Sequence, residues 1–519
     1  MKFLFICLVF FCVSTNLFAQ KNVILIIADD LGSDYCGFYE NHVDTVNLPN
    51  VRRLLKGGVR FKNAWANPFC SPTRAGILTG RYSFRTGVGA AIGGATSAVL
   101  DTAEMTIPRL LKKFKPNGLI QAHIGKWHLQ TPNPKTNFTF PNKMGYDHFE
   151  GSFPGELPNY FSWTKITNGT DATSTRYATT ENVDNAVSFI KKNKEQSFFL
   201  WLAFNAPHIP LHLPPSDLTK AKLSGTAADI SANPKAYFKA MNEAMDHEIG
   251  RLFDSLTTYN LWAKTDIIFI GDNGDDSPVA QSSPAKGSVY QGGLNVPMII
   301  SGPSVTSPNR VSDALVHTTD LFATILELFG HTTWSSEIKA SKPVDSKSLF
   351  PILKNEKTDV RDWIFAEVFG GPAPASEGKT IRNKSYKYIA MDNGNKLLFN
   401  LQTDPSEKTN LYNTAATGAN LTNLEFLCSE MSKLLQLPNG CSLVLASQEE
   451  IKTINPFPNP FTSQIQLAID QADSEFELVN VAGQEILKGK NISNQDVNPI
   501  PKGIYFLRVH GHVFKLVKE

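Results

Sequence analysis

Three strongly apolar runs, each followed closely by polar side chains, constrain the fold of this chain most. They are residues 22–28, before Asp29 and Asp30; residues 197–205, before His208; and residues 265–271, before Asp272 and Asn273. Continuous apolar runs of this length are typical of strands that are buried on both faces in a parallel sheet. Open α/β sheets bind ligands at the carboxyl ends of their strands. The sequence therefore predicts an α/β fold, a large and mostly parallel sheet flanked by helices, with a site at that edge.

The acidic residues after two of these runs suit a metal ion. Asp29 and Asp30 are adjacent carboxylates, which repel each other unless a cation lies between them. Hard cations such as Ca²⁺ or Mg²⁺ prefer such oxygens, and the carboxylate and amide of Asp272 and Asn273 suit the same ion. A solvated turn, with Asp30 as a helix cap, is the alternative for the first pair, and a simple turn for the second. Asp275 and Asp276, a little further on, could be exposed to solvent.

A cysteine lies at a predicted helix start in the segment 67–81. Pro72 fits the first turn of a helix, where a missing N–H group costs nothing, and residues 73–78 can continue it. Cys70 would then lie at the positive end of the helix, where anions bind well. Arg74 adds a forked cationic donor four residues later. A nucleophile and an anion site therefore coincide, although a buried structural cysteine would also fit these residues.

Two short motifs offer bases and a further cation. If the segment Gly-Lys-Trp-His-Leu at 125–129 stays extended, Lys126 and His128 point to one side and Trp127 to the other. His208 lies between two prolines, which hold its backbone rigidly. A surface lysine and hydrogen-bonded structural histidines are the alternatives for these residues.

Other segments are predicted from local patterns. Asn50 is expected to cap a helix that ends near residue 57. The long amphipathic helix over 237–259 is expected to place Asp246, His247 and Glu248 on its solvent face. Residues 152–179, rich in Thr, Asn, Gly and aromatics, are expected to form long loops that carry specificity.

The length of 519 residues indicates two or three domains. Residues 1–19 have the charged, apolar and small-residue order of a secretion signal, with cleavage after Ala19, and no later run reaches about 18 apolar residues. The remaining boundaries are predicted as a main domain at 20–360, an antiparallel subdomain at 361–445, a Pro-rich linker at 446–458 and a small β-sandwich at 459–519.

Charge and cysteine content narrow the possible partners. The net charge is +2 and no basic block is present, so nucleic acid is not expected as a partner. Four of the six cysteines remain after the signal is removed. Cys428 and Cys441 are close enough to form a disulfide in an oxidising compartment, but the sequence alone leaves this open.

Several motifs together resemble the sulfatase family. They are Cys-x-Pro-x-Arg followed by Ala-Gly-Ile-Leu-Thr-Gly, the opening strand with its two aspartates, Gly-Lys-Trp-His-Leu, and the segment that begins at Lys286. The likeness runs from about residue 22 to about residue 437. It has two departures: Gln291 stands where Glu is common, and Asn295 where Arg is common. We expect both to alter loop support or substrate choice.

The resemblance implies a set of roles. Cys70 would be oxidised to formylglycine, whose hydrate is the nucleophile in that family. One Ca²⁺ ion would be held by Asp29, Asp30, Asp272, Asn273 and the oxygen at position 70. Arg74 would position the nucleophile, Lys126 and Lys286 would bind sulfate, His128 would contact the formylglycine hydroxyl, and His208 would protonate the leaving oxygen.

The terminal segment resembles a second family. Pro-Asn-Pro-Phe, Gly-Ile-Tyr-Phe-Leu-Arg-Val and a Lys near the end are similar to the sorting domain of type IX secretion in Bacteroidota. A carbohydrate-binding or structural β-domain is the alternative. The resemblance implies export through the outer membrane, with release or attachment at the cell surface, and the secretion machinery as a partner.

The sequence therefore predicts a secreted sulfatase that acts on sulfate esters, with a sulfated glycan as the expected substrate and a formylglycine-generating enzyme as a partner. Two rivals remain. A phosphodiesterase or phosphonate hydrolase can use the same formylglycine site, and a glycan-binding protein without activity can share the scaffold.

Overall fold

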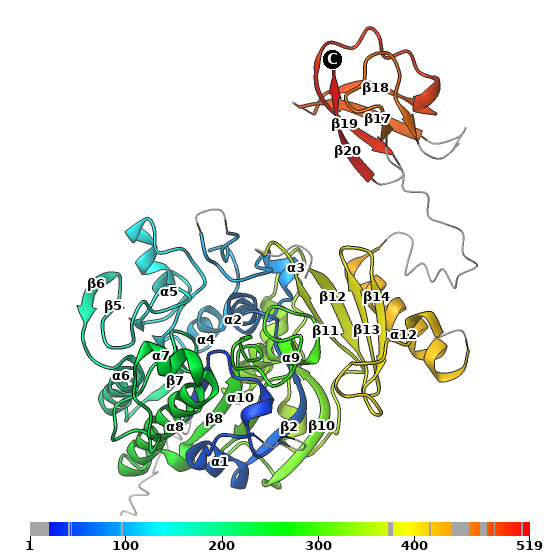
Figure 1. Ribbon diagram of the computed structural model, residues 1–519. Helices are drawn as coiled ribbons and strands as arrows, with labels where there is room; N and C mark the ends of the chain where they lie inside the picture. Colours follow the sequence, from blue (N-terminus) through cyan, green and yellow to red (C-terminus); the bar gives the residue numbers. More distant parts are fainter. Residues whose placement is uncertain are drawn as a thin grey trace, which may run out of the picture. The chain divides into compact units, whose positions relative to one another are not determined.

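The computed structural model describes residues 20–39, 42, 44–94, 97–371, 377–414, 417–437, 456–467, 475–481, 483–509 and 512–519. The predicted signal peptide at 1–19, residues 446–455 of the predicted linker, and Cys441 of the possible disulfide lie outside these residues. The chain forms two compact units, Met1–Ser442 and Leu443–Glu519, which are described separately (Figure 1).

The first unit is built on a ten-stranded sheet in the order β10-β2-β9-β8-β1-β7-β3-β4-β5-β6. The three predicted strands are its centre: β1 (Asn22–Ala28) pairs in parallel with both β7 (Ser197–Ala203) and β8 (Thr265–Gly271). The other strands are β2 (Gly58–Trp65), β3 (Leu119–Gly125), β4 (His148–Gly151), β5 (Trp163–Thr167), β6 (Thr170–Ser174), β9 (Met298–Ser301) and β10 (Arg310–His317). Because β9 runs antiparallel to β2 and β8, the sheet is mixed but mostly parallel, as predicted.

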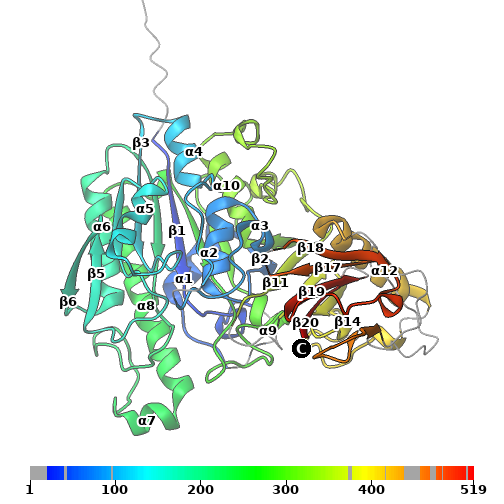
Figure 2. The ribbon, with the colours of Figure 1, turned by 90° about the horizontal axis from the view of Figure 1, so that it is seen from above.

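Helices cover both faces of this sheet. Alternate side chains of β1 enter two different apolar clusters, so that Leu25 packs on one face and Ile26 on the other. The first face is covered by α2 (Cys70–Thr79), α4 (Ile107–Phe114) and α10 (Leu321–Leu328), and the second by α1 (Pro49–Lys56), α6 (Ala178–Lys192) and α8 (Pro234–Thr258). Figure 2 shows α2 and α10 on one side of β1 and α6 and α8 on the other.

The start of helix α1 differs from the prediction. Asn50 does not cap the helix, because it lies inside the first turn; the cap position is Leu48, which has no capping side chain. Instead, the carboxylate of Asp246 on α8 accepts hydrogen bonds from the backbone N–H groups of Asn50 at 3.0 Å and Val51 at 2.8 Å. Of the three residues predicted on the solvent face of α8, His247 is exposed, whereas Asp246 and Glu248 are buried, so their predicted exposure was wrong. A cap donated by another helix leaves no local sequence signal.

The segment 152–179 is also more ordered than predicted. Strands β5 and β6 form a hairpin within it, and β5 continues the main sheet by pairing with β4. The hairpin is only partly buried: Trp163, Ile166 and Ser174 are buried, and the other strand residues are half-buried or exposed, as is common at the edge of a sheet. The predicted loops are therefore confined to the residues before the hairpin and the short stretch after it.

A four-stranded antiparallel sheet follows in the same unit, as predicted. Its strands are β11 (Ile364–Val368), β12 (Gly378–Arg382), β13 (Tyr386–Met391) and β14 (Lys396–Asn400), and helix α12 (Gly418–Leu435) packs on β12 and β13. Ile364 and Ala366 share an apolar cluster with Trp65 at the end of β2. This subdomain is thereby anchored directly to the main sheet.

The second unit contains two antiparallel sheets around one apolar cluster, in agreement with the predicted β-sandwich. A two-stranded sheet holds β15 (Pro456–Phe457) and β16 (Gln466–Leu467); a four-stranded sheet holds β18 (Glu485–Lys490), β17 (Glu475–Asn480), β19 (Gly503–Val509) and β20 (His512–Lys518). The cluster includes Phe461 and Leu507. Over the described ranges of the whole chain, no helix is both long and apolar enough to cross a bilayer.

Candidate active site

Residues from six separate segments meet at the carboxyl edge of the main sheet. The polar residues that follow β1, β3, β7 and β8 lie there together with the first turn of α2 and a loop after β8. The structure brings together every site residue predicted from the sequence: Asp29, Asp30, Cys70, Arg74, Lys126, His128, His208, Asp272, Asn273 and Lys286. All are buried or nearly so.

Cys70 is the first residue of α2 and contacts a histidine. Its side chain is 2% exposed, and Cys70 Sγ lies 3.1 Å from His128 Nδ1. The other ring nitrogen, Nε2, lies 2.8 Å from the carbonyl oxygen of Ile92 and must therefore carry the hydrogen. Burial and the neighbouring Lys126 ammonium hold the pKa of His128 well below its usual range. A neutral ring with Nδ1 as acceptor therefore faces the thiol.

The backbone around Lys126 and His128 is bent, which the prediction of an extended segment did not include. Gly125 has φ +98° and His128 has φ +52°, both in the left-handed region. A Cβ at Gly125 would lie 1.8 Å from the carbonyl oxygen of Ala203, so only glycine fits here. Both polar side chains still reach the site, while Trp127 is buried in the apolar core on that face of the sheet.

Arg74 is fixed by several charged or polar groups. Its Nε and Nη2 atoms donate to Asp272 Oδ2 at 3.1 and 2.7 Å, and Nη1 donates to the carbonyl oxygen of Lys126 at 2.8 Å. Its Nη2 also lies 3.9 Å from Asp29 Oδ1. A planar fork with all three nitrogens engaged has a single orientation, so Arg74 presents a fixed positive charge.

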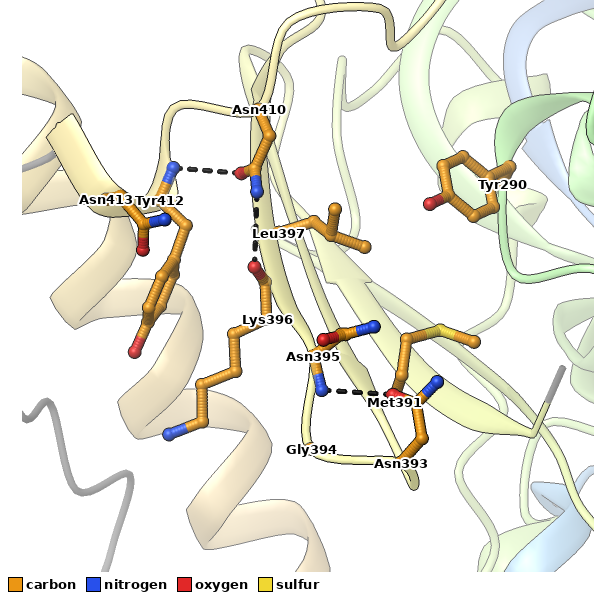
Figure 3. Close-up of a pocket in the computed structure, with 10 residues that line it drawn as sticks. All are labelled: Tyr290, Met391, Asn393, Gly394, Asn395, Lys396, Leu397, Asn410, Tyr412 and Asn413. Atoms are coloured by element: carbon orange, nitrogen blue, oxygen red, sulfur yellow. Dashed lines mark hydrogen bonds between the residues drawn. The ribbon is translucent and has the colours of Figure 1, made fainter. Parts of the chain in front are cut away.

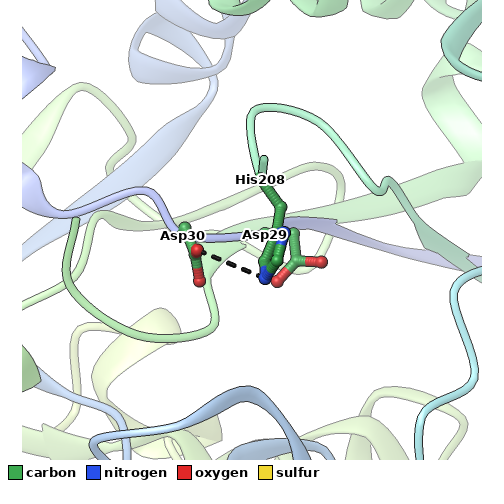
Figure 4. A group of neighbouring side chains, drawn as sticks. All are labelled: Asp29, Asp30 and His208. Atoms are coloured by element: carbon green, nitrogen blue, oxygen red, sulfur yellow. Dashed lines mark ion pairs between the residues drawn. The ribbon is translucent and has the colours of Figure 1, made fainter. Parts of the chain in front are cut away.

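Asp30 lies at the centre of the acidic residues and has a strained backbone, with φ +64°. Its N–H group donates to Asp272 Oδ1 at 3.0 Å. Its Oδ1 accepts from Asn273 Nδ2 at 2.7 Å, and its Oδ2 from Lys286 Nζ at 2.6 Å, with His208 Nε2 at 3.6 Å (Figure 4). Burial opposes ionisation of Asp30, but Lys286 and His208 outweigh it and hold the pKa well below its usual range.

Asp29 has a different environment from its neighbour. It pairs with the ammonium group of Lys126, and neither side chain is exposed. Burial and the nearby charge of Asp272 raise the pKa of Asp29 to about 8. The pKa values of these two adjacent carboxylates are therefore shifted in opposite directions. Shifted pKa values of this kind are frequent at functional sites.

His208 is positioned by a tyrosine that sequence patterns did not reveal. Tyr160 Oη, from the loop before β5, lies 2.6 Å from the carbonyl oxygen of Asn205 and 2.8 Å from that of His208. His208 Nδ1 lies 2.8 Å from the carbonyl oxygen of Ile209, which leaves Nε2 facing the acids. Burial, together with the charge of Lys126, lowers the pKa of His208 to about 4. Tyr160 belongs to no motif, so only the fold identifies it.

Asp275 is buried rather than exposed. It is 2% exposed, and its Oδ1 accepts a hydrogen bond from the N–H group of Gly32 at 2.8 Å. Burial raises its pKa well above the usual range. The sequence gives no sign of this contact, because the turn that Asp275 supports lies more than 200 residues away in the chain.

The two departures from the family pattern support loops. Gln291 Oε1 accepts from Trp65 Nε1 at 2.7 Å, and the Gln291 N–H group donates to Glu407 Oε2 at 2.6 Å. Asn295 Nδ2 donates to Ser33 Oγ at 2.7 Å. These contacts join the segment after Lys286 to the main sheet and to the antiparallel subdomain.

Comparison with known proteins identifies the family. A family model described as Sulfatase matches residues 21–331, which include every residue of this site. The chain belongs to the sulfatase family. It is accordingly an enzyme that hydrolyses sulfuric esters. Two more models match the sulfatase: the C-terminal part of N-sulphoglucosamine sulphohydrolase at residues 285–433, and a secretion system C-terminal sorting domain at residues 455–519.

Individual relatives have low sequence identity to this chain, but the matches cover most of both chains. The sulfatase is 26% identical over 486 residues to an N-acetylgalactosamine-6-O-sulfatase of Bacteroides thetaiotaomicron, covering 76% of this chain and 89% of the relative. It is 27% identical over 391 residues to an uncharacterized sulfatase of Escherichia coli, covering 65% and 67%. Among solved structures, Ps i-CgsB in complex with k-i-k-neocarrahexaose has 28% identity and a TM-score of 0.66, covering 80% of this chain and 92% of that one.

Proposed function

We propose that this sulfatase removes sulfate from a glycan, with a formylglycine made from Cys70 as nucleophile and one Ca²⁺ ion at the strand ends. The observation that carries the proposal is the contact of 3.1 Å between Cys70 Sγ and His128 Nδ1, inside a buried group of carboxylates and cations. A purely structural cysteine would be expected among apolar side chains instead. A nucleophile that is held against a neutral base fits covalent catalysis.

The acidic residues fit a metal ion. Asp29 Oδ1 and Asn273 Oδ1 are buried and have no hydrogen-bond partner in the described part of the chain. Ligand atoms of Asp29, Cys70 and Asp272 lie within 4.8 Å of one another. Buried oxygens without partners are costly unless a further group satisfies them, and Ca²⁺ prefers such ligands. Asp29, Asp30, Asp272 and Asn273 would hold the ion, and its contribution when bound is polarisation of a sulfate oxygen.

Three cations would stabilise charge on the sulfuryl group. Arg74 is already fixed by Asp272, and Lys126 and Lys286 are held by Asp29 and Asp30. Because these charges are oriented before substrate binds, little reorganisation is needed as negative charge develops on the sulfuryl oxygens. The ion pairs also compensate the burial of both signs of charge.

Two histidines would move protons at opposite ends of the reaction. His128 Nδ1 accepts from the group at position 70, because Nε2 is used by the carbonyl oxygen of Ile92. His208 Nε2 faces Asp30, and because Nδ1 donates to the carbonyl oxygen of Ile209, Nε2 must first take up a proton. The protonated ring would then pass this proton to the departing alcohol oxygen. Placement of one base and one acid on separate loops matches the two proton transfers of ester hydrolysis.

A sulfated glycan is the proposed substrate class. Support comes from the relatives: one is an N-acetylgalactosamine-6-O-sulfatase, and one solved structure contains k-i-k-neocarrahexaose. The sorting-domain match at 455–519 and the signal-like residues 1–19 support export to the outside of the cell, where such polymers occur. A formylglycine-generating enzyme would act on Cys70, and the type IX machinery would act on the tail.

The first test is the mass of the peptide that contains residue 70, from protein made in a host that matures sulfatases. Conversion of cysteine to formylglycine lowers the mass by about 18 Da, from the change of CH₂SH to CHO. An unmodified thiol in protein that nevertheless hydrolyses sulfate esters would contradict the proposed nucleophile. Rates on matched sulfate and phosphate esters would then separate a sulfatase from a phosphodiesterase. Chelation should lower both the rate and the melting temperature, and Ca²⁺ should restore both.

A further inference from the structure

A second hollow of about 520 Å³ lies outside the catalytic centre (Figure 3). Most of it is formed by the β13–β14 hairpin and the loop after β14, and one side chain, Tyr290, reaches it from the segment that follows Lys286. We call it the hairpin pocket and define it by Tyr290, Met391, Leu397 and Tyr412 on its walls and Asn395 and Asn413 at its rim.

The lining combines apolar walls with side-chain amides that form no hydrogen bond to the described part of the chain. Tyr290, Leu397 and Tyr412 are half-buried, and they are therefore held in place while part of each remains open. The side-chain amides of Asn395 and Asn413 are exposed and make no hydrogen bond to the described part of the chain. Flat aromatic surface next to amide donors and acceptors is the chemistry that a pyranose ring requires, since sugars have apolar C–H faces and polar edges.

The hairpin pocket has a rigid frame. Asn410 Oδ1 accepts from the N–H groups of Leu398 at 3.0 Å and Tyr412 at 2.9 Å, and Asn410 Nδ2 donates to the carbonyl oxygen of Lys396 at 3.3 Å. These bonds fix the loop that contains Tyr412 to strand β14. A preformed wall lowers the entropy lost when a ligand binds.

Few charged side chains line the hairpin pocket. Lys396 is the only charged residue among the ten that line the pocket. It lies with its ammonium group 6.0 Å from the ring centre of Tyr412. One cation beside neutral amides favours a ligand that is mostly hydroxylated and carries few anionic groups. Highly charged ligands such as nucleotides would require more cations.

The hairpin pocket is joined to the catalytic centre through shared packing. Phe69, the residue before Cys70, belongs to the same apolar cluster as Tyr290 and Leu397. In addition, the N–H group of Gly287 donates to the carbonyl oxygen of Pro68 at 2.9 Å, so the segment that supplies Tyr290 is bound directly to the loop of the nucleophile. Lys286 and Tyr290 are four residues apart, which limits the distance between their Cα atoms to roughly 14 Å.

We propose that the hairpin pocket is a second glycan-binding subsite, which holds a sugar unit of the same sulfated polymer whose ester is cleaved at Cys70. This inference rests on the proposed function for the identity of the polymer. Tyr412 contacts an apolar face of the sugar on one side of strand β14, Tyr290 lines the pocket from the other side of that strand, and the amides of Asn395 and Asn413 bind hydroxyl groups of the sugar. The subsite increases affinity for long chains and leaves the chemical step unchanged.

Affinity electrophoresis of the full chain tests the proposal without requiring turnover. Native gels contain ι-carrageenan, chondroitin 6-sulfate or no polymer, and migration over a range of polymer concentrations gives Kd. We expect retardation by at least one polymer. The double variant Tyr412→Ala with Asn395→Ala should bind that polymer roughly tenfold more weakly, because truncation of a central aromatic contact is commonly worth this much.

The matched control is Phe426→Ala, which removes a partly exposed aromatic residue from the same subdomain outside the hairpin pocket. Unchanged binding by the double variant, or no retardation of the parent protein by either polymer, would overturn the proposal. The rate on 4-nitrophenyl sulfate distinguishes the two proposals. Polymer binding that depends on the pocket, in protein that hydrolyses no sulfate ester, would refute the proposed function and leave the subsite in place.

Discussion

The catalytic centre and the hairpin pocket handle polar groups in opposite ways. In the centre, the charged side chains are buried or nearly so and are bound by partners of opposite sign, as in the pairs Arg74–Asp272 and Lys126–Asp29. In the pocket, the polar groups are mostly neutral, and the amides of Asn395 and Asn413 face solvent without partners in the described chain. Buried ion pairs fix geometry for one reaction, whereas exposed amides and aromatic rings can adapt to a polymer of variable sequence.

This contrast has a physical cause. Stabilisation of developing charge is strong only where water is excluded, and exclusion of water requires that every resting charge be paired. Binding of a neutral hydroxyl group does not require a site from which water is excluded. The four predictions below test this contrast, from the largest expected effect to the smallest.

Replacement of the nucleophile should have the largest effect. Cys70→Ala should abolish turnover of 4-nitrophenyl sulfate, because no group remains to be oxidised or to attack. The side chain is small, so the melting temperature should change by only a few degrees. The control is Cys36→Ala, which removes the other buried free cysteine of the described chain and should keep full activity. Full activity in Cys70→Ala would refute the assigned nucleophile.

Loss of a fixed charge should come next. Arg74→Lys keeps the positive charge but cannot reproduce the fork on Asp272 or the bond to the Lys126 carbonyl. We expect kcat/KM to fall roughly 100- to 1,000-fold, as for removal of one preorganised donor. Arg81→Lys, which alters a buried pair with Glu104 outside the centre, should lower stability and keep the rate. Equal effects of the two variants on rate would show that Arg74 acts only through folding.

Removal of the hydroxyl group that holds the His208 loop should have a smaller effect. Tyr160→Phe loses the contacts with the carbonyl oxygens of Asn205 and His208. We expect kcat to fall about tenfold for a sugar sulfate, whose leaving oxygen needs a proton, but much less for 4-nitrophenyl sulfate. Tyr35→Phe is the control, because Tyr35 is likewise a buried tyrosine and its hydroxyl group donates to the carbonyl oxygen of Val279. Identical losses on both esters would contradict a role through His208.

The smallest effect on activity is expected at a buried carboxylate that forms no ion pair within the described part of the chain. Glu367 accepts from the N–H group of Phe84 at 2.7 Å, but its second oxygen has no partner among the described residues. Burial raises its pKa from 4.5 to about 7. The folded state therefore binds this proton more tightly than the unfolded state does, so stability is lost as pH rises from 4.5 to 7 and is level above that range.

This loss would be at most about 3 kcal/mol. Glu367→Gln should remove it, so the variant should melt above the parent at pH 8 and close to it at pH 4.5, with sulfate hydrolysis unchanged. Parallel melting curves of the two proteins across that pH range would contradict the assignment. The result sharpens the contrast with Asp30, whose cationic partners lower its pKa instead.

Much of the fold and the catalytic centre could be predicted, because both depend on local patterns. The apolar run before Asp29 gave the central strand, and the motif around Cys70 gave a helix start. Asp246 and Asp275 were assigned wrongly to the surface, since their partners lie on segments about 200 residues away or more. Tyr160 was missed for the same reason. Long-range hydrogen bonds have no periodicity that a sequence could display.

The sequence by itself determined the α/β class and the family, and it predicted the residues that the structure brings together at the candidate active site. Apolar runs and short motifs carry that information in consecutive residues. Only the tertiary structure decided which acid pairs with which cation, how His128 turns toward Cys70 through a left-handed backbone, and that Tyr290 joins the β13–β14 hairpin in one pocket. Those features depend on contacts between distant segments and on burial, which exist only after the sheet and helices have packed.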